Sequence, residues 1–188
     1  MGCGQGGAYK NMNADPAGFA HQKVIFLDRD GVINEQAPIH DYIKRWEDFK
    51  FLPGVIEALR LLKESNYRIY IISNQQGIAR KMMSEETLKV IHANMQQELA
   101  AHGASVDGIY YCPHGKDEMC SCRKPNPGML LRAAKENNIR LADALFIGDA
   151  ESDMLAGERA GCKTVFLKAP ETLLGIVNKL LEGQKASV

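Results

Sequence analysis

The sequence of 188 residues lacks a net charge and lacks a long apolar run, and each absence excludes a class of protein. Its 23 Lys and Arg residues balance 23 Asp and Glu residues, so no overall field draws the chain to nucleic acid or to an anionic membrane. No apolar segment approaches the roughly 20 residues that cross a bilayer, and the first residues do not have the basic and apolar regions of a signal peptide. We therefore expect a cytoplasmic protein that binds neither nucleic acid nor a membrane.

Residues 1–22 are rich in Gly, Asn and Ala and show no sustained apolar periodicity, which predicts a loose N-terminal arm. Residues 23–188 suit a single domain, because this length is sufficient to bury a core and shows no internal repeat or low-complexity tract. The stretches between the main motifs are too short for a large cap domain. We expect one globular unit that works as a monomer.

Strand and helix patterns alternate along residues 23–188. The apolar run Val24–Leu27 is too short for a helix and predicts a strand that is buried on both faces. This alternation predicts an α/β fold, with a mainly parallel sheet and helices on both faces. Further strands are predicted at 67–72, 109–111, 144–147 and 164–167, and helices at 53–63, 85–102, 127–137, 152–160 and 171–181.

Polar clusters follow the predicted strands. Parallel sheets bind ligands beyond the carboxyl ends of their strands, at a topological switch point. These clusters are therefore expected to form one site. They are Asp28-Arg29-Asp30 after the first strand, Ser73-Asn74-Gln75 after the second, Cys112–Lys124 after the third and Gly148-Asp149 after the fourth.

Asp28 and Asp30 stand two residues apart directly after a buried strand, where an unpaired carboxylate is costly. Residues at this spacing in an extended segment point the same way, so both acids address one point while Arg29 turns aside. Asp149, after the fourth strand, brings a third carboxylate to that point. Three acidic side chains predict a hard divalent cation on oxygen ligands, Mg²⁺ above all.

Phosphoryl transfer is the chemistry that these residues suit. A phosphate dianion beside carboxylates needs counter-charge from Mg²⁺ and Lys124, while Ser73 and Asn74 offer hydroxyl and amide groups to its oxygens. Asp28 needs no base to act as the nucleophile, because an ordinary aspartate is ionised at neutral pH. Asp30 is placed to protonate the leaving alkoxide and later to take a proton from the attacking water. The predicted activity is hydrolysis of a phosphomonoester through an aspartyl phosphate, and the predicted substrate is a small phosphorylated metabolite.

The four clusters together resemble the four motifs of the haloacid dehalogenase superfamily, in the family's order and over roughly Val24–Leu167. The resemblance implies a Rossmann-like fold, Asp28 as the nucleophile and Asp30 as the acid/base. It also implies Mg²⁺ ligands from Asp28, Asp149 and the main-chain carbonyl of Asp30, with Asp153 in support. The stretches that carry the resemblance are Asp28–Ile33, Ser73-Asn74, Lys124 and Gly148–Asp153.

A second cluster, in the loop 112–122, combines a Cys-x-His pair with a Cys-x-Cys pair. Four such ligands fill a closed tetrahedral zinc site and leave no position for water, so we expect a structural zinc that fixes the loop. In a cytosolic chain this clustering favours a metal over disulfides. Cys162 stands apart and is predicted to be a small buried residue. The four expected zinc ligands are Cys112, His114, Cys120 and Cys122.

The zinc loop is similar to those of two phosphatase groups in the superfamily, which act on heptose 1,7-bisphosphate and on histidinol phosphate. We favour removal of the 7-phosphate from D-glycero-D-manno-heptose 1,7-bisphosphate, in the synthesis of bacterial lipopolysaccharide precursors. Histidinol phosphate stays open as the alternative, because the loop between His114 and Cys120 is short. Ala150 and Lys81 also stand where heptose enzymes often have Lys and Gly. The stretches similar to the heptose enzymes are Asn74–Arg80, Gly108–His114 and Cys122–Met129.

Arg123 adjoins Lys124 and is predicted to hold the second, non-reacting phosphate of the substrate, because a guanidinium binds phosphate through two hydrogen bonds. The segment 34–49 lies where the superfamily has a small specificity loop. Trp46 is predicted to pack against the domain, as is Phe49. Lys44 and Arg45 are candidates for further phosphate contacts. The predicted substrate-binding residues are Ser73, Asn74, Gln75 and Arg123.

Two other functions use the same fold. One is a binding protein that has lost catalysis, and the presence of Asp28, Asp30, Lys124 and Asp149 argues against it. The other is a phosphatase for phosphoproteins or nucleic-acid ends, which needs a basic groove or a partner domain. The neutral charge and short length of the chain argue against that alternative.

Overall fold

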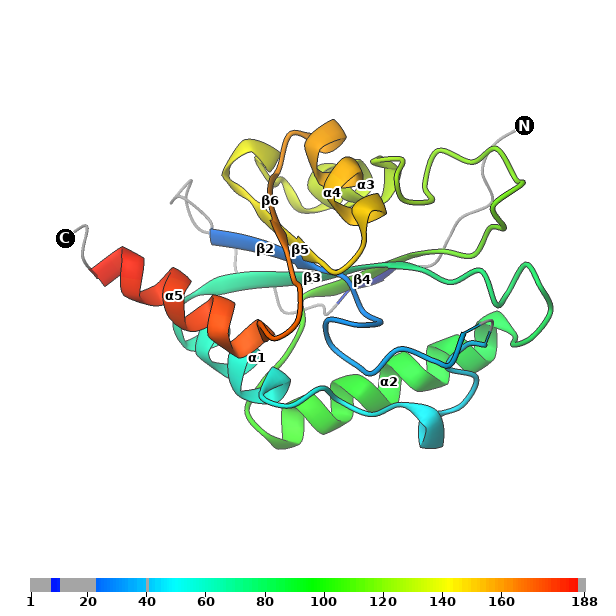
Figure 1. The fold of residues 1–188 in the computed structure, drawn as a ribbon, viewed down its shortest axis with the longest axis horizontal. Coiled ribbons are helices and arrows are strands. Elements are labelled where there is room, and N and C mark those ends of the chain that lie inside the picture. The colour runs from blue at the N-terminus through cyan, green and yellow to red at the C-terminus, as the bar shows by residue number, and fades with distance from the viewer. Residues whose placement is uncertain (1–7, 11–22, 40, 186–188) are drawn as a thin grey trace.

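The computed structural model describes residues 8–10, 23–39 and 41–185. Its strands form one six-stranded sheet with the order β1-β4-β3-β2-β5-β6 (Figure 1). Strands β2 to β6 pair in parallel, and β1 pairs antiparallel with β4 at one edge. The predicted α/β fold with a mainly parallel sheet is confirmed. The strands are β1 (Ala8–Lys10), β2 (Lys23–Leu27), β3 (Tyr67–Asn74), β4 (Gly108–Cys112), β5 (Leu145–Gly148) and β6 (Lys163–Phe166).

Helices cover both faces of the sheet, as predicted. Helices α1, α2 and α5 lie on one face and α3 and α4 on the other, each group with its own apolar core against the sheet (Figure 1). The helices are α1 (Val55–Glu64), α2 (Glu85–Ala101), α3 (Gly128–Asn137), α4 (Glu151–Ala160) and α5 (Leu173–Lys185), with short 3₁₀ helices at Trp46–Asp48 and Leu141–Asp143.

Strand β2 shows why its sequence is an unbroken apolar run. Successive side chains of a strand point to opposite faces of the sheet. Ile25 and Leu27 accordingly pack into the core below α1 and α5, and Val24 and Phe26 pack into the core below α3 and α4. The strand is buried on both faces, as the sequence predicted.

The order of the strands creates a switch point beside β2. The chain runs outward from β2 through β3 to β4, then returns to the other side of β2 for β5 and β6. Such a reversal opens a crevice at the carboxyl ends of the two central strands. Asp28 follows β2 there, and its main-chain N–H donates to the carbonyl of Ile147 in β5 at 3.0 Å. The sheet therefore brings the first and fourth motifs together.

Several motif residues belong to the strands rather than following them. The second strand was predicted to end at residue 72, but β3 continues through Ser73 and Asn74. Strands β4 and β5 likewise end on Cys112 and Gly148. These residues therefore have the fixed backbone geometry of a central sheet, which suits groups that must hold a ligand in place.

The first two helices begin through different local signals. The sequence places the first helix start at Pro53, but α1 begins at Val55 because Gly54 has a left-handed φ of 76°. Helix α2 begins as predicted, since the Ser84 side chain accepts a hydrogen bond from the N–H of Thr87 at 3.0 Å.

Strand β1 lies within residues 1–22, where the sequence predicts a loose arm and no strand. It pairs Tyr9 with Ile109 of β4. Residues 1–7 and 11–22 lie outside the described part, so the division of the chain at residue 22 stays a prediction. Within residues 8–10, 23–39 and 41–185, every helix falls short of the length and apolar character that a bilayer span demands.

Trp46 and Phe49 pack on the domain as expected. The Trp46 ring stacks on Phe49 at 5.1 Å between centroids, and Phe49 is buried. Lys44 pairs with an acid in its own segment, Asp41, and Arg45 similarly pairs with Asp48. These ion pairs occupy the two basic side chains that the sequence offered as phosphate contacts.

Candidate active site

A buried lysine joins two carboxylates at the carboxyl end of the sheet. The Nζ atom of Lys124 lies 2.7 Å from Oδ1 of both Asp28 and Asp153, and it donates to the carbonyl of Ile72 at 2.9 Å. Burial opposes the charge of this ammonium, but the two carboxylates outweigh burial and raise the pKa of Lys124. Lys124 is therefore a fixed positive charge beside Asp28.

The pKa of Asp28 differs from that of an ordinary aspartate, which the sequence analysis assumed. Burial raises the pKa of Asp28 to about 7, and Lys124 limits that rise while the charges of Asp153 and Asp30 add to it. The sequence predicted the usual low pKa because the burial of this carboxyl group is not visible in the sequence. A cation bound beside Asp28 opposes the shift, because positive charge favours the ionised carboxylate.

Arg29 does not turn aside from the site, contrary to the prediction made from the spacing of Asp28 and Asp30. Its Nη2 atom lies 2.8 Å and 2.9 Å from the two carboxylate oxygens of Asp30. Asn34 and Gln75 add hydrogen bonds to the same carboxylate at 2.9 Å and 3.1 Å. Burial opposes ionisation of Asp30, but the Arg29 ion pair and these hydrogen bonds outweigh it and lower the pKa of Asp30. The carboxylate of Asp30 is therefore fixed by Arg29, Asn34 and Gln75.

The acids that suit a cation are Asp28, Asp149 and Asp153, with one carboxylate oxygen of each within 4.8 Å of the others. Asp153 is committed elsewhere, because Oδ1 meets Lys124 and Oδ2 accepts from the N–H of Ala150 at 3.0 Å. The side chain of Asp30 is not in this group. Asp28 and Asp149 are therefore the side chains that best fit a divalent cation, and Asp153 supports Lys124, the kind of role that the sequence suggested.

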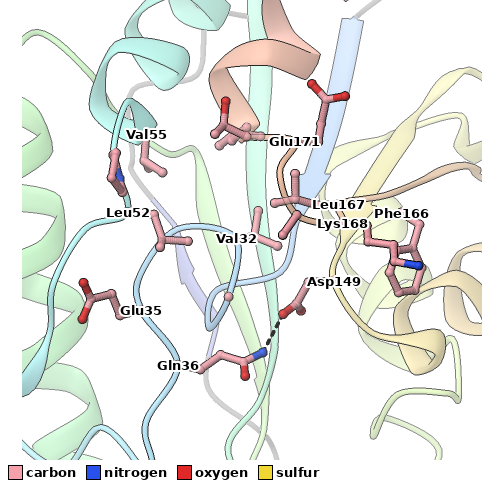
Figure 2. Close-up of a pocket in the computed structure, with 15 residues that line it drawn as sticks. Val32, Glu35, Gln36, Leu52, Val55, Asp149, Phe166, Leu167, Lys168 and Glu171 are labelled. Carbon is pink, nitrogen blue, oxygen red and sulfur yellow. Dashed lines mark hydrogen bonds between the residues drawn. The ribbon is translucent and has the colours of Figure 1, made fainter.

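Asp149 lies close to another carboxylate, and a bound cation would reduce the repulsion between the two charges. Burial and the nearby charge of Asp153 raise the pKa of Asp149. Its Oδ2 accepts a hydrogen bond of 2.6 Å from the amide of Gln36, as Figure 2 shows. Beyond this pair lies a pocket of about 550 Å³ with largely apolar walls, which include Leu52, Val55 and Leu167.

Gly31 leaves the space that Asp149 occupies. Its φ is 89°, and a Cβ atom there would lie 2.0 Å from Oδ2 of Asp149. Gly161 offers a matched control, because its φ is 82° and a Cβ atom there meets nothing within 4 Å. Gly161→Ala therefore introduces backbone strain alone, which costs about 1–2 kcal/mol.

We expect Gly31→Ala to lower the free energy of unfolding by about 1–3 kcal/mol more than Gly161→Ala does, because it adds overpacking to the same strain. Denaturant titration of both variants measures the difference. Equal losses would mean that Asp149 moves away from Gly31 without cost.

A second pocket, of about 820 Å³, is lined by Lys124. Its walls also carry two further basic residues, Lys116 and Arg123, and one acid, Glu118. Asn74 also lines it and clamps Lys124 in place, since Oδ1 accepts from the Lys124 N–H at 3.0 Å and Nδ2 donates to the Lys124 carbonyl at 3.2 Å. The basic wall suits an anionic substrate.

The other two residues of the second motif lie deeper. Ser73 and Gln75 are buried, and the amide of Gln75 donates to the Ser73 hydroxyl at 2.7 Å and to Asp30 at 3.1 Å. In this arrangement Gln75 connects the second motif to Asp30. The predicted substrate contacts thus divide between the pocket wall, with Asn74 and Arg123, and the layer beneath it.

The sulfur and nitrogen cluster predicted from the sequence is assembled at the end of β4. The ligand atoms of Cys112, His114, Cys120 and Cys122 all lie within 4.8 Å of one another. The Sγ atom of Cys112 lies 3.7 Å from that of Cys120 and 3.2 Å from that of Cys122, too far for the bond of about 2.05 Å in a disulfide. Bonds of about 2.3 Å from a tetrahedral ion place sulfur ligands nearly 4 Å apart, which the wider of these two spacings matches.

Crowding of the thiols changes their acidity. The hydrogen bond between Cys112 and Cys122 lowers the pKa of Cys122 to about 5 and raises that of Cys112. Cys162 is buried at a distance from this cluster, as predicted, and burial raises its pKa to about 12. The chemistry of the cluster is thus distinct from that of the isolated cysteine.

The loop also fixes Arg123, whose Nη1 donates to the carbonyl of His114 at 3.1 Å. Asn126 donates to the carbonyl of Cys120 at 2.7 Å, and the N–H of Gly128 donates to that of Ser121 at 3.0 Å. These hydrogen bonds tie the cysteine loop to the start of α3. The position of Arg123 on the pocket wall therefore depends on the loop.

Three residues near the site were missed by the sequence analysis. Asn34 and Gln36 contact Asp30 and Asp149. His92, on α2, lies 3.2 Å from Arg29. His92 did have a signal, because it is a polar residue within the apolar stripe of its helix that includes Leu88, Ile91, Met95 and Leu99.

A family model described as a haloacid dehalogenase-like hydrolase matches residues 6–161. The chain belongs to the haloacid dehalogenase-like hydrolases. Within this hydrolase family it is similar to proteins named D-glycero-beta-D-manno-heptose-1,7-bisphosphate 7-phosphatase. The one from Pasteurella multocida is 45% identical over 152 residues, which cover 78% of this chain and 81% of the relative. The one from Helicobacter pylori is 42% identical over 146 residues, covering 77% and 83%.

A solved structure agrees with this assignment to the haloacid dehalogenase-like hydrolases. The D,D-heptose 1,7-bisphosphate phosphatase from B. bronchiseptica, crystallised with magnesium and phosphate, superposes with a TM-score of 0.80 at 32% identity. The match covers 86% of this chain and 99% of that chain. The predicted Rossmann-like fold of the superfamily is confirmed.

Proposed function

We propose that this hydrolase removes the 7-phosphate from D-glycero-D-manno-heptose 1,7-bisphosphate. The observation that carries the proposal is that relatives with this activity in their names are 42–45% identical and are covered over about four fifths of their length. The joined group of Asp28, Lys124 and Asp153 beside a basic pocket supports it. Transfer of the phosphoryl group to water is proposed to proceed in two half-reactions, through Asp28.

In the first half-reaction, a carboxylate oxygen of Asp28 bonds to phosphorus while the bond from phosphorus to the sugar oxygen breaks. The leaving alkoxide takes the proton of Asp30. In the second, water attacks the phosphorus, Asp30 takes the water's proton, and the bond to the Asp28 oxygen breaks to release phosphate. The Arg29 ion pair favours the ionised Asp30 of the second step, and a phosphate dianion nearby favours its protonated form.

Asp28 and Asp149, with the main-chain carbonyl of Asp30, are the proposed Mg²⁺ ligands. When bound, the ion supplies positive charge against the repulsion between Asp28 and a phosphate dianion, which is about 8 kcal/mol at 4 Å with an effective dielectric of about 20. Lys124 supplies the rest of the counter-charge from the protein itself, at 2.7 Å from Asp28. Cys112, His114, Cys120 and Cys122 are the proposed ligands of a structural Zn²⁺.

Arg123 is proposed to bind the phosphate that does not react. We expect Arg123→Ala to lower kcat/KM for the heptose 1,7-bisphosphate about 100-fold, because binding at a remote phosphate holds the reacting group in line. We expect a loss of less than about threefold for the heptose 7-monophosphate, and partial recovery with Arg123→Lys, which keeps the charge without the fork. Phosphate release from both sugars measures these ratios.

Lys116→Ala is the matched control, because it removes the same charge from the same pocket wall. Equal losses on the two sugars for Arg123→Ala would assign Arg123 to the reacting phosphate or to the loop, through its bond to His114. Histidinol phosphate is assayed in parallel. A wild-type preference for histidinol phosphate over both sugars would replace the heptose assignment.

A further inference from the structure

His92 is a polar residue at a position of α2 that otherwise faces the core. It is 1% exposed, and its ring lies 5.9 Å from the ring of Tyr111 in β4. Its Nε2 atom lies 3.2 Å from Nη1 of Arg29. The nearest turn of the helix on either side presents Leu88 and Met95 to the core. An apolar residue would fill this position without burying a polar ring, so packing alone does not account for a histidine.

Arg29 is itself buried, with 1% of its surface exposed. Its guanidinium is planar, with its donors in a fixed fork. One edge of the fork, through Nε and Nη2, faces Asp30 at 2.8–3.3 Å, and the remaining nitrogen, Nη1, faces His92. The three residues thus form one connected row from the core of the domain to the carboxylate of Asp30, two residues after Asp28.

The ring of His92 suits the role of an acceptor in this row. Burial and the positive charge of Arg29 lower the pKa of His92 well below its usual value, so the ring is neutral. An arginine has no acceptor, so the contact requires that Nε2 accept the Nη1 hydrogen. The guanidinium is then anchored at the end opposite Asp30, and its planar geometry leaves the carboxylate little freedom to rotate.

We propose that His92 is a positioning residue that acts through Arg29 to fix the carboxylate of Asp30 for proton transfer to the leaving group. The inference rests on the proposed phosphatase function. It predicts that loss of the His92 acceptor impairs only the chemistry that needs Asp30 as an acid. In that step the bond from phosphorus to the leaving oxygen breaks and the oxygen takes the proton of Asp30.

Substitution of His92 by Gln or by Asn distinguishes a positioning role of His92 from a packing role, because the two amide side chains differ in length. Gln at residue 92 places its amide oxygen close to the position of Nε2, whereas the amide of Asn ends one carbon short of it. We compare His92→Gln and His92→Asn on the heptose bisphosphate, which leaves as an alkoxide, and on 2,4-dinitrophenyl phosphate, whose leaving group needs no proton. The parameter is kcat/KM, which reports the steps through departure of the leaving group.

General acid catalysis contributes about 10²–10⁴-fold, so we expect His92→Asn to lose about 10–30-fold on the sugar and less than about twofold on the aryl ester. His92→Gln should recover most of the loss. Met95→Leu, a volume-conserving change one turn further along α2, should alter neither rate by more than about twofold. Equal losses of His92→Asn on both substrates, or no loss on either, would overturn the proposal.

If His92→Asn does not fold, Arg29→Lys tests the same row from its middle. A lysine keeps a positive charge on Asp30 but lacks the fork that reaches His92 at the same time. The proposal expects the same selective loss on the sugar, and equal losses overturn it. Failure of the proposed function is distinguishable, because the wild-type protein itself would then fail to release phosphate from the heptose bisphosphate.

Discussion

The Asp28→Asn variant is expected to release phosphate at least about 10⁴-fold more slowly than the wild-type protein, as loss of a catalytic nucleophile does elsewhere. The amide of asparagine has no nucleophilic carboxylate oxygen and forms no acyl phosphate. In the wild-type protein the N–H of Arg29 donates to Oδ1 of Asp28 at 2.7 Å. The fold should persist in the variant, because the asparagine amide oxygen still accepts this hydrogen bond. Lys124 keeps its pairing with Asp153 at 2.7 Å.

The matched variant is Asp30→Asn, which retains the nucleophile and removes the acid. With 2,4-dinitrophenyl phosphate it should form the aspartyl phosphate and hydrolyse it slowly, so acid-quenched protein carries phosphate on Asp28. Asp28→Asn protein should carry none. Circular dichroism confirms that both variants are folded. Substantial turnover by folded Asp28→Asn protein would remove Asp28 from the role of nucleophile.

The sequence predicted which motifs meet at the site, because the sequence signals for these motifs are local. An apolar run that ends in two acids predicts both the strand β2 and the place of Asp28, and parallel strands bring their carboxyl ends to one edge. Cysteines at ligand spacing predict a cluster regardless of the surrounding fold. This is why Asp149 lies beside Asp28, and why the three cysteines and the histidine of the loop form a separate cluster, as expected.

The orientation of Arg29 could not be predicted in the same way. Its partner His92 is 63 residues away in the sequence, and only the packing of α2 against the sheet brings the two together. The raised pKa of Asp28 likewise depends on burial, which is a property of the assembled domain. Strand β1 was missed because three residues are too few to show an alternating pattern.

The loop between β4 and α3 has little regular structure to hold it in place, so the proposed zinc is expected to stabilise it. Residues 113–127 contain no helix or strand. Cys120 and Cys122 pack in the apolar core on one face of the sheet, and Arg123 and Lys124 follow directly. In such loops the free energy of zinc binding, about 10–16 kcal/mol in zinc-finger peptides, becomes free energy of folding.

We expect Cys122→Ser to abolish zinc binding, to lower the melting temperature by at least about 10 °C and to stop catalysis, because Lys124 loses its fixed position. Elemental analysis and thermal denaturation of the purified protein measure the first two effects. Cys162→Ser is the matched control, since it makes the same change of sulfur to oxygen at a buried cysteine outside the cluster. It should retain about one zinc per chain.

The two proposed metals should also be separable in the wild-type protein, because their ligands differ in kind. Oxygen ligands at an open crevice exchange Mg²⁺ readily, whereas thiolates in a closed site release zinc slowly. A mild chelator should therefore stop catalysis in a way that added Mg²⁺ reverses, while zinc survives gel filtration. If protein purified without zinc is equally stable and active, the cluster is not a zinc site. If Mg²⁺ fails to restore activity while zinc is still bound, the assignment of Asp28 and Asp149 to Mg²⁺ is wrong.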